Sequence, residues 1–381
     1  GEEDQVSGKR GNGEGSITKR KDGRWMARYT VHTTKGLRRK TIYGRKREEV
    51  RDKLARALAD RADGLIFDAG TLTVKEYLET WLKDVDKDTV RESTYERHEN
   101  VVNLHLVPTL GRIKLSKLNP AHVQGLYRER LESGLSPATV QKIHAVLHKA
   151  LSQAVKWSLI PRNATEAVKA PRPTPEEMHP LSREETRRLL RSAEGDRLEA
   201  LYVLAVHTGM RQGELLALKW EDIDLENAVV RARRTLTRSG GRFSLGEPKT
   251  KKSRRTVHLT DAATQALKDH LRRQLLEIEV LGDSYQDHGL IFTTTAGTII
   301  NPTNLRKRSF ARLLKRAGLS AIRFHDLRHT CATLLLSRNV HPKYVQELLG
   351  HASISITLDT YSHFVPAMGD QTAQAMQDVL S

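Results

Sequence analysis

Five prolines between residues 161 and 180 divide this chain, because neither a helix nor a central strand continues through so many. The segment PRNATEAVKAPRPTPEEMHP is therefore expected to be a linker. The full length of 381 residues also exceeds what one ordinary core holds. The chain must fold as separate units on either side of residues 161–180.

The N-terminal part changes pattern twice. Residues 1–16 are rich in glycine and charge and are expected to be flexible. GRWMARYTVHTTKGLRRKTIYG then alternates apolar and polar residues, which predicts a hairpin or three short strands. RKREEVRDKLARALADRADG has helical spacing and stops at Gly64. We expect residues 1–66 to form a small sheet backed by one helix.

Residues 71–160 are helical throughout and predict an all-α domain. Candidate N-caps are Thr73, Ser93, Asn119 and Ser136, with Pro120 and Pro137 at first helical positions. Residues 181–381 open on a helix capped at Ser182, and the short strands VVRARRTL and RRTVHL interrupt further helices. The predicted fold is multidomain, mainly α with small β-sheets, and its last domain is mixed.

The charge balance points to a polyanionic partner. There are 64 Lys and Arg against 46 Asp and Glu, a net charge of +18. A ribosomal, membrane-surface or merely soluble basic protein could show the same excess. The single cysteine, Cys331, excludes an internal disulfide and a cysteine zinc cage. With no apolar run of about eighteen residues and an acidic start, we expect a cytoplasmic protein without a membrane partner.

The N-terminal sheet is a candidate DNA-reading module. Residues 1–65 hold 18 Lys and Arg against 10 Asp and Glu. Strands can enter a major groove while arginines and lysines contact phosphates and bases. The candidate DNA-binding residues are Arg24, Arg28, Arg38, Arg39 and Lys40. A solvated charged face is the alternative explanation.

Two arginine motifs in the last domain suit an anion. In HTGMRQGELLALKWEDID, Arg211 lies one turn before Glu214, which could hold it; a purely structural pair fits equally well. In RFHDLRHTCATLLL, His325 and Arg328 point the same way, as a phosphate site requires. His325 and His329 also have the spacing of a metal pair, although no acidic third ligand is nearby.

A third motif lies near the C-terminus. In VQELLGHASISITLDTYSHF a helix stops at Gly350, His351 follows, and Tyr361 comes ten residues later. Alone, such a tyrosine is usually an ordinary aromatic whose hydroxyl is hydrogen-bonded.

Taken in order, these residues resemble the tyrosine recombinases, also called the phage integrase family. The strings TGMRQGELLAL, HDLRHT and LGHASISITLDTYSH carry the likeness. The resemblance implies a catalytic set of Arg211, Lys249, His325, Arg328, His351 and Tyr361, with Glu214 orienting Arg211. It implies a three-part integrase with an arm-type DNA-binding domain (1–66), a helical SAM-like core-binding domain (71–160), a linker (161–180) and a catalytic domain (181–381).

The implied reaction is cleavage and rejoining of DNA without a metal or other cofactor. Tyr361 would attack to give a 3′-phosphotyrosine, which preserves the energy of the broken bond. The arginines would hold the non-bridging oxygens, and His325 or His351 could assist proton transfer. The resemblance places the general acid on a hairpin lysine; Lys249 is preferred, while Lys251 and Lys252 compete for that role.

The resemblance also implies partners. They are double-stranded DNA with core and arm sites, three further copies of the chain in a synaptic tetramer, an accessory DNA-bending protein and an excisionase. The enzyme of a phage or mobile element would act on the nucleoid of a bacterial host. Three alternatives stay open: a type IB topoisomerase or telomere resolvase, a DNA-binding regulator without catalysis, and an RNA-binding or chromatin-like basic protein.

Overall fold

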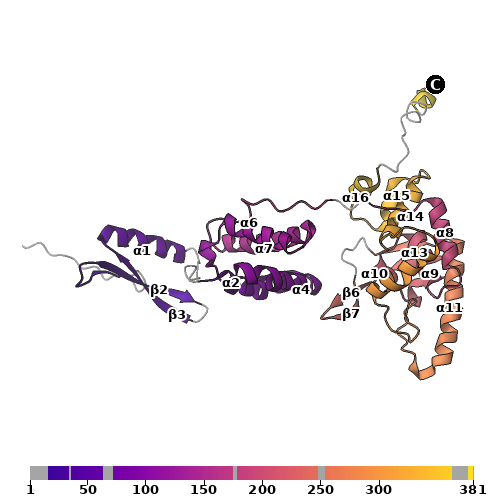
Figure 1. The fold of residues 1–381 in the computed structure, drawn as a ribbon, viewed down its shortest axis with the longest axis horizontal. Coiled ribbons are helices and arrows are strands. Elements are labelled where there is room, and N and C mark those ends of the chain that lie inside the picture. Colours follow the sequence, from indigo (N-terminus) through magenta and orange to yellow (C-terminus); the bar gives the residue numbers. More distant parts are fainter. Residues whose placement is uncertain are drawn as a thin grey trace, which may run out of the picture. The chain divides into compact units, whose positions relative to one another are not determined.

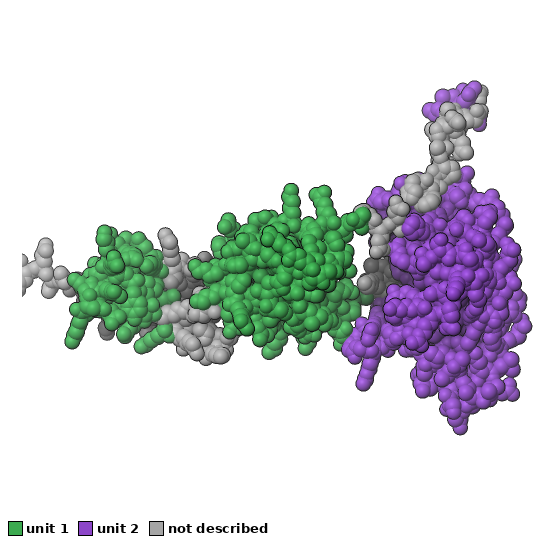
Figure 2. Space-filling view, viewed as in Figure 1, with its two compact units in different colours: residues 1–175 green, residues 176–381 purple. Residues whose placement is uncertain are grey.

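The computed structural model describes residues 16–33, 36–62, 72–174, 178–247, 254–362 and 376–380. The chain divides into two compact units, residues 1–175 and residues 176–381 (Figure 2). The described residues are mostly helical with small antiparallel sheets, which confirms the predicted fold class. None of the described helices is both long and apolar enough to cross a bilayer.

The N-terminal sheet has the order β1-β2-β3 and one helix packed on it (Figure 1). The elements are β1 Ser16–Lys19, β2 Trp25–Thr33, β3 Gly36–Gly44 and α1 Arg47–Ala62. Ala27 on β2 packs with Val50 and Leu54, one turn apart on α1. The sequence predicts that residues 1–16 are flexible, but Ser16 is the first residue of β1 and pairs with Arg28. Residues 1–15 lie outside the described part.

A helical bundle forms the rest of the first unit. Its helices are α2 Val74–Trp81, α3 Lys87–Thr89, α4 Glu92–Val101, α5 Val107–Leu110, α6 Pro120–Glu132 and α7 Pro137–Lys156, with π-helical turns at Leu82–Asp86 and Val102–Leu106. Thr73, Asn119 and Ser136 cap their helices as predicted. Ser93 does not, because α4 already begins at Glu92 and the Arg91 carbonyl accepts from the Thr94 N–H.

The bundle core extends past the last helix. Tyr77, Trp81 and Tyr127 fill its centre, and each is at most 1 % exposed. Ala164 and Val168 pack on the same core, so the chain stays attached to the bundle within the segment expected as a linker. The side chain of Asn163 contributes by accepting hydrogen bonds from the backbone N–H and the hydroxyl of Thr165.

The second unit surrounds a nearly all-apolar helix. The helices are α8 Arg183–Ala193, α9 Glu199–Thr208, α10 Gln212–Leu215, α11 Asp261–Leu281, α12 Pro302–Asn304, α13 Ala311–Arg316, α14 Asp326–Leu336, α15 Pro342–Leu349 and α16 Ile354–Tyr361, with a π-helical segment at Leu305–Phe310. The central helix is α9, buried from Ala200 to Val206 because its apolar residues face all directions.

Two small sheets lie between α10 and α11 along the chain. One sheet has the order β4-β5-β8, from β4 Ile223–Asp224, β5 Val229–Ala232 and β8 Arg255–His258. The other pairs β6 Thr235–Ser239 with β7 Arg242–Gly246. Val230 faces Val257 across the β5–β8 ladder, and both are buried in the core. This core anchors β8, from which Arg255 projects.

Two left-handed glycines bring helix ends together. Gly209 ends α9 with φ 60°, and Gly350 ends α15 with φ 67°, backbone conformations that other residues rarely adopt. A Cβ at Gly209 would stand 2.6 Å from Leu349 Cδ2 and 3.3 Å from Cys331 Sγ. The ends of α9 and α15 therefore meet against the side of α14.

Candidate active site

Arg211 stands just beyond the Gly209 turn, as the residue before α10. Its backbone N–H donates to Glu214 Oε2 at 3.0 Å, and its Nη1 donates to Glu214 Oε1 at 2.8 Å. The Arg211 side chain is 38 % exposed, whereas that of Glu214 is 3 % exposed. A buried carboxylate thus holds one edge of the guanidinium and leaves the remainder accessible.

Arg255 holds the same carboxylate from the other side. Its Nη2 donates to Glu214 Oε2 at 3.0 Å, and its Nε donates to the Leu348 carbonyl at 2.5 Å. Burial opposes ionisation of Glu214, but the charges and hydrogen bonds of Arg255 and Arg211 outweigh it and lower the pKa of the Glu214 carboxyl. Glu214 is thus an anion that joins two arginines.

Arg328 is the most deeply buried cation of the group, at 2 % exposure. Its Nη1 donates to the Gly209 carbonyl at 2.8 Å and its Nη2 to the Leu349 carbonyl at 2.7 Å. Burial, then the charges of Arg211 and Arg255, lowers its pKa to about 9, so Arg328 remains charged at neutral pH. These carbonyls end helices, where the helix dipole favours a cation.

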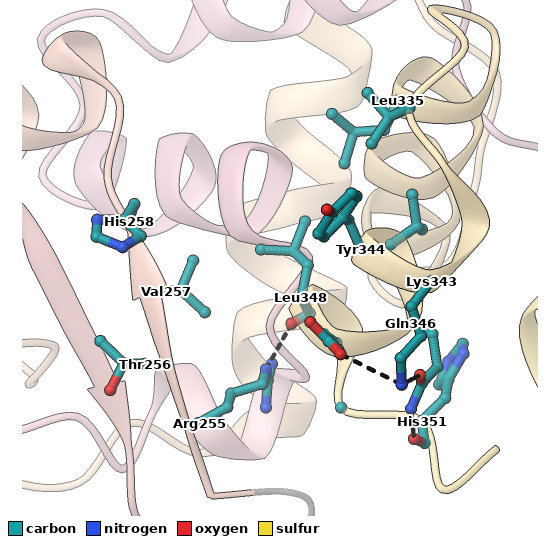
Figure 3. A pocket seen from close by; sticks show the side chains of 14 residues that line it. Arg255, Thr256, Val257, His258, Leu335, Lys343, Tyr344, Gln346, Leu348 and His351 are labelled. Carbon is teal, nitrogen blue, oxygen red and sulfur yellow. Dashed lines mark hydrogen bonds and ion pairs between the residues drawn. The ribbon is translucent and has the colours of Figure 1, made fainter. Parts of the chain in front are cut away.

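The C-terminal end of α15 positions His351. Leu348 and Leu349 give their carbonyls to Arg255 and Arg328, and the chain then reverses at Gly350. His351 Nδ1 lies 2.9 Å from Thr357 Oγ1, and Gln346 Nε2 donates to the His351 carbonyl at 2.7 Å. Figure 3 shows Arg255 and His351 lining a pocket of about 630 Å³ between β8 and α15.

His325 and His329 lie one turn apart at the start of α14. Their rings meet edge to face with centroids 5.0 Å apart. Burial, reinforced by the charges of His329, Arg328 and Arg211, lowers the pKa of His325 to about 4. Burial and the nearby arginines likewise lower the pKa of His351 to about 4. Both imidazoles are therefore neutral at neutral pH and can donate one hydrogen bond each.

Tyr361 is the last residue of α16 and is 1 % exposed. Its ring packs against Ala332, Leu336, Val345 and Leu349. Its Oη lies 2.6 Å from His329 Nδ1. Burial raises the pKa of Tyr361 to about 12, although the charge of Arg328 acts in the opposite direction. The hydroxyl is therefore protonated at neutral pH.

Comparisons with known proteins show the family of the chain. Residues 180–367 match the phage integrase family, and residues 73–131 match the phage integrase N-terminal SAM-like domain. A tyrosine recombinase XerC-like protein of Caldanaerobacter subterraneus subsp. tengcongensis is 33% identical over 90% of this chain and 92% of its own length. The chain belongs to the phage integrase family. It is a site-specific DNA recombinase, as the resemblance in its motifs indicated.

Other integrases are similar to the chain in sequence or in fold. The ICEBs1 integrase of Bacillus subtilis is 28% identical over 75% of this chain and 78% of its own length. The Tn1549 transposon integrase, solved with a circular intermediate DNA, has a TM-score of 0.67 at 22% identity and covers 82% of this chain and 100% of its own. A lambda integrase tetramer on a Holliday junction has a TM-score of 0.56 at 20% identity, covering 95% and 97%.

Five of the six predicted catalytic positions of this recombinase lie in one cluster: Arg211, His325, Arg328, His351 and Tyr361. The sixth, Lys249, lies outside the described residues, as do its competitors Lys251 and Lys252. Glu214 accepts two hydrogen bonds from Arg211. For the metal alternative at His325 and His329, the described ranges contain no group of three or more residues placed to bind an ion.

The predicted arm residues belong to the first unit. Arg24 precedes β2, and Arg28 and Arg39 are exposed on the sheet. Arg28 pairs with Thr41 and Arg39 with Thr30, so Arg28 and Arg39 share one face of the β2–β3 ladder. Arg38 and Lys40 lie on β3, and their side chains are outside the described part.

Sequence reasoning missed two residues of this recombinase site. The sequence pattern assigns Arg255 only to a strand, and His329 only to a candidate metal pair. The spacing in HDLRHT does place His329 beside His325. Nothing in the local pattern indicates that its Nδ1 meets the hydroxyl of a tyrosine 32 residues away.

Proposed function

We propose that this recombinase cleaves DNA through attack of Tyr361 on a phosphodiester, forming a 3′-phosphotyrosine. The observation that supports the proposal is the cluster itself: Tyr361 is buried within the electrostatic reach of Arg328, which in turn interacts with Arg211 and Arg255. In the transition state the non-bridging oxygens of the phosphate carry negative charge that must be neutralised. Guanidinium groups neutralise this charge without a metal ion.

The roles follow from accessibility. Arg211 is the arginine that a DNA phosphate can reach most easily, because over a third of its side chain is exposed. Each terminal nitrogen of Arg328 donates one N–H to a carbonyl, Nη1 to that of Gly209 and Nη2 to that of Leu349. The remaining N–H groups of the guanidinium can donate to the phosphate. Neutral His325 and His351 add hydrogen bonds to the same group. Because the bond energy is stored in the phosphotyrosine, a 5′-hydroxyl can reseal the strand.

The proposed general acid for the 5′-oxygen is Lys249. Its support is the resemblance of GEPKTKKSRRTVHL to the hairpin lysine of the family. A 5′-bridging phosphorothiolate substrate tests the choice, because a thiolate leaves without taking a proton. Replacing the true acid by alanine should slow cleavage of ordinary DNA. The phosphorothiolate substrate should restore the cleavage rate of that variant. The same measurement on Lys249→Ala, Lys251→Ala and Lys252→Ala separates the three lysines.

We further propose the division of labour that the resemblance implies. Residues 1–66 bind arm-type DNA, residues 71–160 bind core DNA, and residues 181–381 perform catalysis in a tetramer. Support comes from the basic N-terminal sheet, the SAM-like match, and the lambda integrase tetramer solved on a Holliday junction. A phage or other mobile element in a bacterial cytoplasm is the proposed setting, with a DNA-bending protein and an excisionase as accessory partners.

One experiment tests the phosphotyrosine. The protein is incubated with nicked suicide duplexes tiled across the DNA that flanks its coding sequence, and covalent complexes are separated on a denaturing gel. We expect an adduct that maps to Tyr361 by mass spectrometry and is lost in Tyr361→Phe. Retention of the adduct in Tyr361→Phe would assign another nucleophile. Stable DNA binding without any adduct would favour a DNA-binding regulator. Relaxation of supercoiled DNA without strand exchange would favour a topoisomerase.

A further inference from the structure

We propose that His329 is the catalytic residue that takes the proton of Tyr361 when the tyrosine attacks DNA. The inference deepens the proposed function and rests on it. It moves this role away from His325 and His351, the two imidazoles that the sequence motifs favoured.

The contacts of the three histidines distinguish them. His329 Nδ1 lies 2.6 Å from Tyr361 Oη. His351 directs its Nδ1 at Thr357 Oγ1 instead, at 2.9 Å. His325 meets the His329 ring edge to face. Proton transfer requires a heavy-atom distance of about 2.6–3.2 Å, and His329 satisfies it toward the attacking atom.

The two side chains are held rigidly. Tyr361 packs in an apolar cluster with Ala332, Leu336 and Leu349. His329 lies on α14, which is fixed by Thr330 Oγ1, a donor to the Asp326 carbonyl and an acceptor from the Leu181 N–H. The hydrogen bond therefore joins two anchored helices, α14 and α16, and sets the position of the hydroxyl.

The protonation states suit the transfer. Burial raises the pKa of Tyr361 to about 12, so the phenol does not ionise alone. Burial also lowers the pKa of His329, with Asp326 opposing and Arg323 and Arg328 reinforcing the shift. A neutral imidazole carries one unprotonated nitrogen, and the phenol hydroxyl donates to it.

The step balances with the groups already named. The Tyr361 O–H bond breaks and its proton passes to His329 Nδ1, while Oη forms a bond to phosphorus. The P–O5′ bond breaks, and the 5′-oxygen takes a proton from the acid proposed as Lys249. In the resealing step the 5′-hydroxyl attacks phosphorus and gives its proton back to the neutral amine proposed as Lys249. The bond between phosphorus and Tyr361 Oη breaks, and the imidazolium of His329 returns its proton to the departing tyrosine oxygen.

The test separates basicity from positioning. His329→Asn places an amide atom near the Nδ1 position but is not a base, and His329→Leu removes the contact. The matched control is His207→Asn, because His207 Nδ1 makes the same kind of bond to a hydroxyl, Thr260 Oγ1, at 2.8 Å. Adduct formation is measured under single turnover on 5′-phosphorothiolate duplexes, where the leaving sulfur needs no proton.

We expect both His329 variants to form the Tyr361 adduct on the order of 10²-fold more slowly than wild type, with unchanged DNA affinity. His207→Asn should react at the wild-type rate. Wild-type speed in His329→Asn would overturn the proposal and leave His329 only a positioning role. Wild-type speed in both His329 variants would exclude either role.

A second readout does not depend on DNA. Protein labelled with ¹³Cζ-tyrosine shows the Tyr361 carbon as the resonance that Tyr361→Phe lacks. This resonance should shift in His329→Leu and stay in place in His207→Asn. No shift in His329→Leu would contradict the contact itself. If the shift occurs but wild type forms no adduct, the proposed function fails while the hydrogen bond stands.

Discussion

Arg255 on β8 and Glu214 on α10 form an ion pair that is buried on both sides, with side-chain exposures of 7 % and 3 %. The pair connects the small sheet to the arginine at the head of α10. Because Arg255 also holds the Leu348 carbonyl, it links Arg211 to the turn that carries His351.

Removing Arg255 should therefore destabilise the second unit. Arg255→Leu leaves Glu214 with Arg211 alone, and breaking a buried pair costs about 3 kcal/mol. The free energy of unfolding, measured in urea, should fall by that amount. The neighbouring exposed pair of Arg254 and Glu247 provides the control, since Arg254→Leu should cost less than about 1 kcal/mol. Equal losses in the two variants would contradict the role of Arg255.

Arg328→Lys should impair cleavage more than binding. One ammonium group cannot bridge the Gly209 and Leu349 carbonyls, which accept from separate guanidinium nitrogens. We expect adduct formation to slow by about 10²–10³-fold. Arg316 bridges Ser192 and Asp196 at the surface, and Arg316→Lys should leave the rate unchanged. A cleavage rate in Arg328→Lys within about threefold of wild type would argue against phosphate stabilisation there.

Stability should fall on mild acidification. The pKa values of His325 and His351 are about 4 in the folded protein, below the ordinary value of 6.5. Between pH 4 and pH 6.5 the unfolded protein therefore binds more protons than the folded protein. The free energy of unfolding that these histidines contribute is fully present above pH 6.5 and is lost as pH falls toward 4. Each histidine contributes at most about 1.4 kcal/mol per pH unit.

Urea titrations from pH 7.5 to pH 4.5 measure how the free energy of unfolding depends on pH. This range crosses most of the interval between the pKa values of the folded and unfolded states. The double variant His325→Asn, His351→Asn should have a flatter profile than wild type. Parallel profiles would show that these two imidazoles are not the groups that take up the protons.

The N-terminal sheet should account for part of the salt dependence of DNA binding. Arg28 and Arg39 share an exposed face, and the affinity for DNA falls by about one power of salt concentration for each phosphate contact. In Arg28→Ala, Arg39→Ala the slope of log K against log salt should drop by about two. The double variant Lys46→Ala, Arg51→Ala removes the same charge from exposed positions in and before α1. An identical decrease of the slope in both double variants would show that the slope reports only net charge, and would contradict a specific role of Arg28 and Arg39.

Gly209→Ala should disturb the point where helix ends meet. The alanine would have to adopt φ 60° and would place its Cβ 2.6 Å from Leu349 Cδ2. Left-handed strain and overpacking together should lower the free energy of unfolding by about 3 kcal/mol. Gly195 has φ 75° with nothing near its Cβ position, so Gly195→Ala should cost only about 1 kcal/mol. Thermal unfolding of both variants measures the difference.

Much of the fold could be predicted because its cues are local. Thr73, Asn119, Ser136 and Ser182 each cap a helix through a backbone N–H three residues later, an interaction within one turn. Ser93 failed as a cap because a helix can also start on backbone hydrogen bonds alone, here at Arg91. The pairing of β2 with β3 was predictable from the alternation of apolar and polar residues in the two segments.

The sequence by itself determined the order of the site residues, the side-chain caps of several helices outside the site, and the membership of the phage integrase family. Tertiary structure alone decided which atoms meet. Arg328 reaches a carbonyl 119 residues away, Arg255 a carboxylate 41 residues away, and Tyr361 an imidazole 32 residues away. Side-chain spacing reports only neighbours within a turn or two, whereas these contacts arise where the ends of α9, α15 and α16 pack against α14 and where β8 meets α10.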